Sequence, residues 1–265
     1  MSKFRYLVTL SYHGISLFGS QKQPNQPTVF GNLELAFLKL FKQPIHCIPC
    51  GRTDTGVHAH VSYCHFDVSF SFDPDTVTGS LNKSLLSAGI MIRAIDRVPL
   101  DFHALSSAIS RTYDYYFTFD SSLPNYLFHS VTVCFKQPLF IPATKQLQQL
   151  FVGQRNFSSL CNVSSDVQSY LRNVTYVDFT FQQYHSLMGT SIDIYKVRIS
   201  ANGFLYKMVR HIVGLLLHSM LNFTNMGRLN EYFLIHRPIS YELAPVQGLH
   251  LAEVNYNNVT KVVTE

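Results

Sequence analysis

The sequence predicts an α+β protein in which short strands alternate with amphipathic helices. Apolar and polar residues alternate over Phe4–Ser11, which is the pattern of a half-buried strand. Leu33, Phe37 and Leu40 then recur at helical spacing, which is the pattern of a helix with one buried face. Because this succession of patterns recurs in the second half of the chain, we expect two halves of similar architecture.

In the first half, strand and helix patterns follow one another in the order β-α-β-β-α-β. Thr28 is a favourable cap for the first helix, and Pro74 is a favourable first residue for the second. This order is the ferredoxin-like arrangement, in which the helices pack on one face of an antiparallel sheet. We predict strands at Phe4–Ser11, Ile45–Cys50, Val61–Val68 and Ile90–Ile95, and helices from Thr28 onward and over Pro74–Leu86.

The second half has the same order of patterns, so we expect two ferredoxin-like halves joined into a central, mainly antiparallel sheet. The boundary falls between Pro99 and His103, which divides the chain into residues 1–103 and 104–265. We predict strands at Ser107–Phe119, Asn173–Phe181, Ser191–Ile199 and Leu249–Tyr256, helices at Pro142–Phe151 and Phe204–Met220, and a further short helix at Arg228–Leu234.

The composition is that of a globular protein with a slightly basic surface. Hydrophobic residues make up 46% of the chain and charged residues 14%, which argues against extended disorder. Lys and Arg outnumber Asp and Glu by 21 to 16, which favours a polyanionic partner only weakly. The five cysteines have no framework spacing, and neither a signal peptide nor a membrane span is expected. We therefore predict a cytoplasmic protein.

The segment Gly51–Ala59, with the sequence GRTDTGVHA, is the strongest candidate for chemistry. Its two glycines permit a tight loop that presents Arg52 and Asp54 outward instead of along a strand. On these residues alone, an ordinary turn with a surface ion pair is an equally good interpretation.

Taken whole, this segment resembles the signature GRTDAGVHA of the tRNA pseudouridine synthase A family, from which only Thr55 departs. The resemblance extends from about Tyr6 to Tyr256 and implies the pseudouridine synthase fold. It is carried by four further blocks: DFHA at Asp101–Ala104, SRTYDY at Ser110–Tyr115, MVRHIVG at Met208–Gly214 and APVQGLHLAEVNY at Ala244–Tyr256.

Three departures from the family pattern lie outside the Asp54 loop. His13 stands where the family has Asp in YDG, Ser20 stands where it has Trp in GWQ, and Leu105 follows DFHA where an Arg is usual. We expect the last two changes to remove a Trp and an Arg from surfaces that contact RNA.

The resemblance implies an isomerase that converts uridine to pseudouridine in the anticodon stem-loop of tRNA, just 3′ of the anticodon. It implies a homodimer and no cofactor. Residues 1–103 would carry the catalytic loop, and residues 104–265 would complete the RNA-binding cleft. The leading alternative is a non-catalytic RNA-binding protein with tandem RRM-like modules, although no RNP-type motif is present. A metal-dependent hydrolase is a third possibility.

The reaction requires an ionised carboxylate close to C1′ and C2′ of the nucleotide. Asp54 fits either as the nucleophile at C1′ or as the base at the 2′ position, and the sequence leaves both open. The resemblance implies that Arg210 pairs with Asp54, although an arginine on a helix more often has only a solvated surface role. His58 and His60 lie near Cys47 and Cys50, but a lone CxxC is a weak indication of a metal site.

The resemblance also implies roles for residues that contact the nucleotide. Tyr113 would stack on the target uracil, Arg52 would occupy the space left by the flipped nucleotide, and Leu249 would pack beneath the uracil. Without the family, Tyr113 would be read as a core residue of its strand. Lys22 and Lys207 are candidates for contacts to the tRNA backbone.

Overall fold

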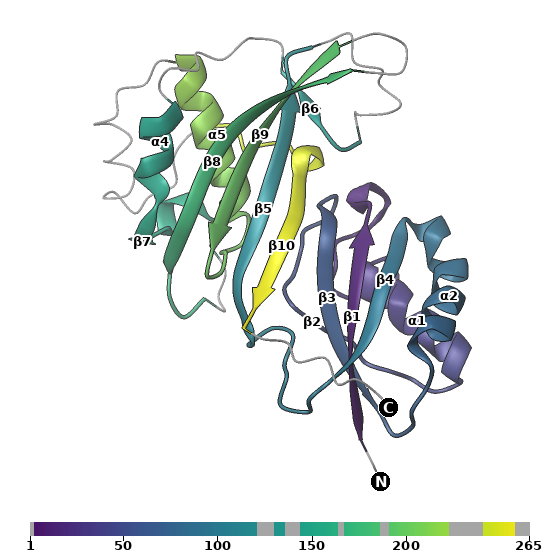
Figure 1. Cartoon of the computed structure of the whole chain (residues 1–265). Coiled ribbons are helices and arrows are strands. Elements are labelled where there is room, and N and C mark those ends of the chain that lie inside the picture. Colours follow the sequence, from purple (N-terminus) through teal and green to yellow (C-terminus); the bar gives the residue numbers. More distant parts are fainter. Residues whose placement is uncertain are drawn as a thin grey trace. The chain divides into compact units, whose positions relative to one another are not determined.

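The computed structural model describes residues 3–120, 130–135, 144–163, 167–185, 191–222 and 241–257 (Figure 1). The chain forms two compact units, of which the first comprises Met1–Ser110 with His250–Glu265 and the second Arg111–Leu249. All but the first residue of the last strand, Leu249–Tyr256, therefore lies in the same unit as the N-terminal part of the chain. The functional division at His103 that the sequence suggests stays a prediction.

The first unit is an antiparallel sheet in the strand order β4-β1-β3-β2. Its strands are β1 (Phe4–Tyr12), β2 (Ile48–Pro49), β3 (His58–Val68) and β4 (Ile90–Val98). This is the ferredoxin-like order that the sequence predicts. Of the predicted strand Ile45–Cys50, Ile48 and Pro49 form the ladder with β3, and Cys50 N donates to the Tyr63 carbonyl oxygen at 2.8 Å. Pro49 has no N–H to donate to a ladder.

The last strand, β10 (Leu249–Tyr256), joins β3 along the part that β2 leaves open. It runs parallel to β3, with His250 opposite His58 and Leu251 opposite Ala59. This pairing places residues from the end of the chain beside the start of β3.

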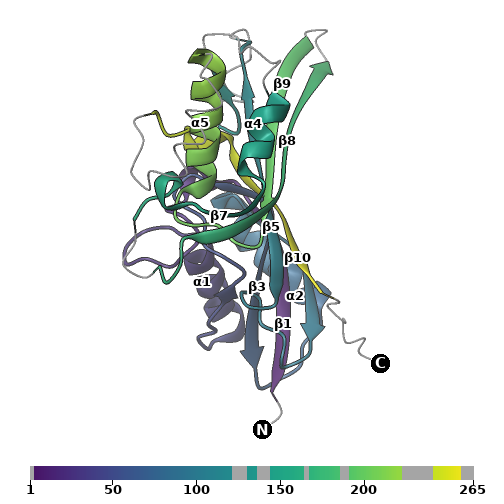
Figure 2. The same cartoon turned by 90° about the vertical axis from the view of Figure 1, so that its left-hand side faces the viewer.

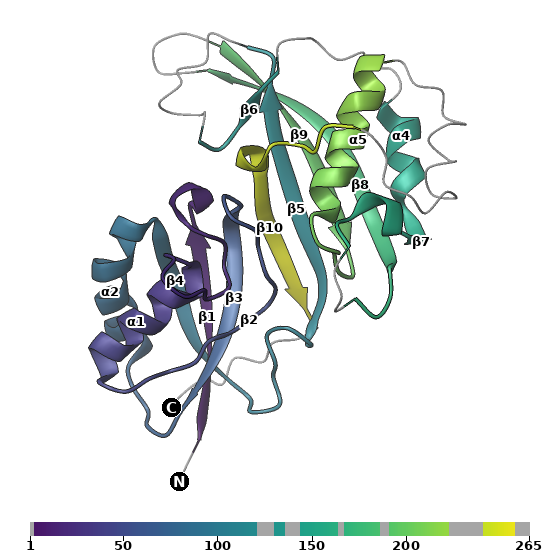
Figure 3. The same cartoon turned by 180° about the vertical axis from the view of Figure 1, so that it is seen from behind.

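Two helices, α1 (Val29–Phe41) and α2 (Pro74–Leu85), lie side by side against the sheet of the first unit (Figures 1 and 3). The Thr28 hydroxyl caps α1 by accepting a hydrogen bond from Gly31 N at 3.2 Å. Phe37 is fully buried, and its ring lies 4.6 Å from that of Phe66 on β3. The predicted cap is confirmed. Of the predicted stripe, Leu33 and Phe37 are buried, whereas Leu40 is 37% exposed, so the prediction is wrong for that residue.

The second unit is a sheet in the order β5-β9-β8-β7, in which neighbouring strands are antiparallel. The helices α4 and α5 lie on the same side of this sheet (Figure 2). The elements are β5 (Ala108–Thr118), β6 (Val133–Cys134), α4 (Thr144–Phe151), β7 (Gly153–Asn156), β8 (Leu171–His185), β9 (Ser191–Ala201) and α5 (Met208–Asn222). The α+β class and the mainly antiparallel pairing are as predicted.

The start of α5 corrects the sequence prediction. The helix begins at Met208 and not at Phe204, because Lys207 has a left-handed backbone with φ of 59°. Lys207 therefore does not share a helical stripe with Arg210. The short helix predicted at Arg228–Leu234 lies outside the described residues.

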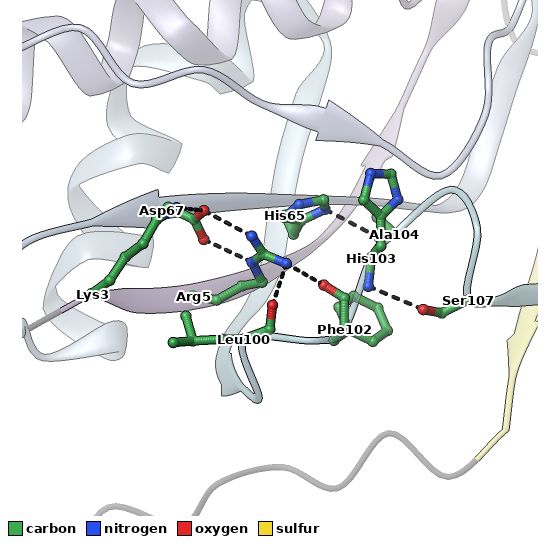
Figure 4. Close-up of polar contacts among 9 residues, drawn as sticks. All are labelled: Lys3, Arg5, His65, Asp67, Leu100, Phe102, His103, Ala104 and Ser107. Atoms are coloured by element: carbon green, nitrogen blue, oxygen red, sulfur yellow. Dashed lines mark hydrogen bonds and ion pairs between the residues drawn. The ribbon is translucent and has the colours of Figure 1, made fainter.

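The loop between β4 and β5 contains the DFHA block and is fastened to the sheet by Arg5 (Figure 4). The guanidinium binds both carboxylate oxygens of Asp67 at 2.7 and 2.8 Å. It also donates to the carbonyl oxygens of Leu100 at 2.6 Å and Phe102 at 2.7 Å. Hydrogen bonding to Arg5 lowers the pKa of Asp67 to about 2. This charged pair holds the loop against β1 and β3.

His65 fastens the same loop from β3 (Figure 4). Its Nδ1 accepts a hydrogen bond from Ala104 N at 3.1 Å, and its side chain is 1% exposed. Burial, with a smaller contribution from the charge of Arg5, lowers the pKa of His65 to about 4. The folded protein therefore holds this imidazole neutral at pH 5, where an unfolded chain would protonate it.

This difference in proton binding predicts a pH-dependent stability. Between pH 6.5 and 4 the unfolded chain binds about one more proton at His65, so the free energy of unfolding falls as the pH is lowered through that window. The contribution of neutral His65 to the free energy of unfolding is present in full above pH 6.5 and is on the order of 2 kcal/mol. In His65→Asn the amide oxygen can still accept from Ala104 N. We therefore expect proton uptake on unfolding at pH 5 to fall by nearly one proton.

Urea unfolding at a series of pH values measures this difference. His46→Asn is the matched control, because it removes a histidine that is exposed on the surface of the same unit. An unchanged pH slope in His65→Asn would contradict the interpretation.

Candidate active site

Asp54 lies in a tight turn between β2 and β3. Val57 N donates a hydrogen bond to the Asp54 carbonyl oxygen at 3.2 Å, which closes a four-residue turn. Gly56 is the third residue of this turn and has φ of +83°, a conformation that favours glycine. The turn that presents Asp54 therefore needs Gly56, the second glycine of the GRTDTGVHA segment.

The segment that follows β1 holds this loop from inside the unit. Thr53 N donates to Ser20 Oγ at 2.8 Å, and Ser20 N donates to the Thr53 carbonyl oxygen at 3.1 Å. The hydroxyls of Tyr12 and Thr53 hydrogen-bond at 2.8 Å, and Gly56 N donates to the Leu17 carbonyl oxygen at 3.3 Å. Four hydrogen bonds thus connect the Asp54 loop to residues 12–20.

A run of histidine rings lies next to the loop. His58 is 2% exposed, and its Nδ1 accepts a hydrogen bond from Gly14 N at 3.1 Å. The His250 ring stacks between those of His58 and His60 at centroid distances of 4.6 and 4.8 Å. Within the residues that the structure describes, no group of three or more His, Cys, Asp or Glu side chains is arranged to hold a metal ion.

The other predicted site residues of the first unit differ in exposure. Asp54 is half-buried, whereas Arg52, two residues before it in the same loop, is exposed. Lys22 is exposed but forms an ion pair of 2.8 Å with Glu34, which raises the pKa of Lys22 through the hydrogen bond. Part of the charge that Lys22 could offer a polyanion is therefore already compensated.

In the second unit, Arg210 lies in the first turn of α5 and is half-buried. Its Nε donates to the Ala244 carbonyl oxygen at 2.8 Å, while Ala244 N donates back to the Arg210 carbonyl oxygen at 3.3 Å. Burial raises the pKa of the nearby Tyr115 hydroxyl, and the positive charge of Arg210 opposes that rise. Arg210 is thus oriented by the backbone of the APVQG segment.

Tyr113, Leu249 and Lys207 also belong to the second unit. Tyr113 is half-buried on β5, and its ring meets that of Phe204 edge-on at 5.2 Å. Leu249 is 5% exposed at the start of β10. Lys207 is half-buried before α5, with Nζ 5.0 Å from the centre of the Tyr206 ring.

Several residues that organise the loops were not assigned a role from the sequence. Ser20, which stands where the family has Trp, is 1% exposed and hydrogen-bonds Thr53 N through its hydroxyl. The loss of an RNA contact at this position stays a prediction. His211 bridges Tyr241 and Asn162 through its two ring nitrogens, at 2.8 Å each. Burial, with the nearby charges of Arg210 and Lys207 adding to it, lowers the pKa of His211 to about 4. The MVRHIVG block could have indicated that His211 matters, but not its partners.

Comparison with known proteins decides the family. A Geobacillus protein named tRNA pseudouridine synthase A is 34% identical over 264 residues, which cover 97% of this chain and 100% of that protein. The chain belongs to the tRNA pseudouridine synthase family. The family model described as tRNA pseudouridine synthase matches residues 147–257. The enzymes of this family are isomerases.

Other relatives in the tRNA pseudouridine synthase family match over most of their length. A protein from Caldicellulosiruptor bescii is 36% identical, over 80% of this chain and 82% of that protein. One from Listeria innocua is 29% identical, over 95% of this chain and 99% of that protein. Both are named tRNA pseudouridine synthase A. A solved dye-decolorizing protein from V. cholerae aligns with a TM-score of 0.20 and 10% identity, over 88% of each chain, which is too weak a likeness to bear on the fold.

The turn geometry predicts opposite effects for two glycine substitutions. Gly56→Ala places a side chain at positive φ and should lower the free energy of unfolding by about 1 kcal/mol. Gly79→Ala is the matched control, because Gly79 lies within α2 and an added Cβ there meets nothing within 4 Å. It should raise the free energy of unfolding by about 0.5–1 kcal/mol. Urea denaturation measures both, and equal signs would contradict the assigned turn.

Proposed function

We propose that this chain isomerises uridine to pseudouridine in the anticodon stem-loop of tRNA, with Asp54 as the essential carboxylate. The observation that carries the proposal is the tight, internally bonded turn that presents Asp54 in the family signature segment. The reaction breaks the bond between N1 and C1′, turns the uracil and rejoins it through C5. It consumes no water and has no redox step, so its chemistry calls for no cofactor.

Asp54 would act as the nucleophile at C1′ or as the base at the 2′ position. Both roles need an ionised carboxylate held in a fixed direction. Half-burial tends to raise a carboxylate pKa, and a neighbouring cation offsets that tendency. We propose Arg210 as this cation, on the resemblance of MVRHIVG to the family block and on the orientation of its guanidinium by Ala244.

Arg52, Tyr113 and Leu249 would handle the nucleotide. The exposed guanidinium of Arg52 suits insertion into the space that a flipped nucleotide leaves. Tyr113 would stack on the uracil and could assist removal of the C5 proton, and its half-buried ring keeps a surface for that contact. Leu249 would pack beneath the uracil, where a buried apolar side chain excludes water.

We propose a homodimer in the cytoplasm that binds tRNA across two subunits, as the family resemblance implies. No helix among the described residues is long and apolar enough to cross a membrane. Lys207 is the better of the two proposed lysine contacts, because Lys22 is paired with Glu34. The alternative of a non-catalytic RNA-binding protein gains no support from the relatives, whose names denote a synthase.

Asp54→Asn tests the essential carboxylate. The amide keeps the shape of the side chain but cannot act as a nucleophile or a base, so we expect a folded protein that binds tRNA and forms no detectable pseudouridine. Pseudouridine is mapped on unmodified tRNA without added cofactor or metal. Asp75→Asn, which removes an exposed carboxylate from the first turn of α2, is the matched control and should remain active. Substantial turnover by Asp54→Asn would refute the assignment of Asp54.

Arg52→Ala tests whether Arg52 holds the flipped nucleotide out of the stack. Opening a paired base costs a few kcal/mol, and less when the base is mismatched. The variant should therefore lose much more activity on a paired uridine than on a mismatched one. Single-turnover rates on both substrates give this difference as a coupling free energy.

Arg93→Ala provides the charge control for this experiment. It removes the same charge from the exposed surface of β4, so it should affect both substrates equally. If Arg52→Ala also loses the same factor on both substrates, Arg52 serves phosphate anchoring or the orientation of Asp54 instead.

A further inference from the structure

Ser20 occupies a position from which it controls the backbone before Asp54. Its side chain is 1% exposed, and it exchanges two hydrogen bonds with Thr53, from Thr53 N to Ser20 Oγ at 2.8 Å and from Ser20 N to the Thr53 carbonyl oxygen at 3.1 Å. Gly19 makes this approach possible, because it has φ of +80° and a Cβ there would lie 2.8 Å from the Thr53 carbonyl oxygen. One residue thus binds both backbone polar groups of Thr53.

This contact constrains the backbone that carries the Asp54 side chain. The Thr53 carbonyl and the Asp54 nitrogen belong to one planar peptide unit, which Ser20 N holds. The next peptide unit contains the Asp54 carbonyl, which Val57 N holds at 3.2 Å. Because both peptide units that flank the Asp54 Cα are fixed, the Cα–Cβ bond has one orientation. The Asp54 carboxylate is therefore carried by a Cα–Cβ bond of fixed direction.

The side-chain bond depends on the residue type at position 20. The tRNA pseudouridine synthase A family has Trp at the position of Ser20, in the motif GWQ. The indole of Trp offers only an N–H donor. It could not accept the hydrogen bond from Thr53 N. The Ser20 hydroxyl oxygen can, and with alanine at this position Thr53 N would be left without this acceptor in a buried environment.

We propose that Ser20 is a positioning residue for catalysis, which acts through Thr53 to hold the Asp54 carboxylate at the reacting carbon. The proposal rests on the proposed function of Asp54. It assigns to Ser20 an effect on the rate of the chemical step and no part in binding tRNA. Tyr12 supports the same anchor, because its hydroxyl hydrogen-bonds Thr53 Oγ1 at 2.8 Å in the interior.

The test compares wild type with Ser20→Ala in single-turnover rate, tRNA dissociation constant and amide exchange at Thr53. We expect the dissociation constant to change less than twofold and the rate to fall roughly ten- to a hundredfold, as displacement of a reacting group by a fraction of an ångström to an ångström does. Exchange of the Thr53 amide hydrogen should become faster. Ser20→Thr keeps the hydroxyl oxygen and should recover part of the rate.

Ser219→Ala is the matched control, because it also removes a buried hydroxyl, one that donates to the Leu215 carbonyl oxygen at 2.7 Å within α5. It should retain the wild-type rate. Should Ser20→Ala fail to fold, Tyr12→Phe takes its place. This variant keeps the ring and removes the hydrogen bond to Thr53 Oγ1, so it should slow the reaction without weakening tRNA binding.

Two results would overturn the role of Ser20. One is a wild-type rate in Ser20→Ala, or in Tyr12→Phe where that variant replaces it. The other is a loss of tRNA affinity that accounts for the whole loss of activity. A failure of the proposed function is distinguishable, since the wild type itself would then form no pseudouridine.

Discussion

The pairing of β1 with β3 is the constraint on which the Asp54 loop depends. Because these strands are antiparallel and Tyr12 lies opposite Ala59, the segment that leaves β1 meets the loop that enters β3. The two exchanged hydrogen bonds between Ser20 and Thr53 then join these irregular segments. The eight residues between β2 and β3 have no regular structure and thus acquire the rigidity of the sheet. The site is held by backbone contacts as well as by the side chains of Thr53 and His58.

Both charged and neutral hydrogen bonds hold the sequence blocks in place. Around the DFHA block, Arg5 and Asp67 remain charged and compensate each other at 2.7 Å. Around the MVRHIVG block, His211 is held by neutral hydrogen bonds to Tyr241 and Asn162. Desolvation disfavours an isolated charge inside a protein. Arg5 and Asp67 are therefore paired, and His211 is neutral. Asp54 and Arg210, two charged residues with proposed chemical roles, are only partly buried, and the Arg210 guanidinium is also bonded to backbone.

The sequence predicts the elements whose patterns are local, and it fails where tertiary contacts decide. The strand β1 and the buried positions Leu33 and Phe37 of α1 follow from residue spacing alone, whereas Leu40 of the same pattern is exposed. The start of α5 was misplaced because nothing in the apolar pattern indicates that Lys207 adopts a left-handed backbone. For the site, the glycines indicated a turn around Asp54 correctly. The bond from Thr53 N to Ser20 Oγ could not be foreseen, because it needs the strand register that brings the two segments together as well as a hydroxyl at position 20.

The parallel pairing of β10 with β3 has a consequence for biosynthesis. His58 and His250 lie opposite each other although most of the chain separates them. During translation, the edge of β3 next to the Asp54 loop stays open until residues 249–256 have left the ribosome, after the whole second unit has been made. Such non-local pairings form late, because the entropy of closing the long loop must be met first. A nascent chain therefore cannot complete the surroundings of the Asp54 loop before synthesis of this last strand.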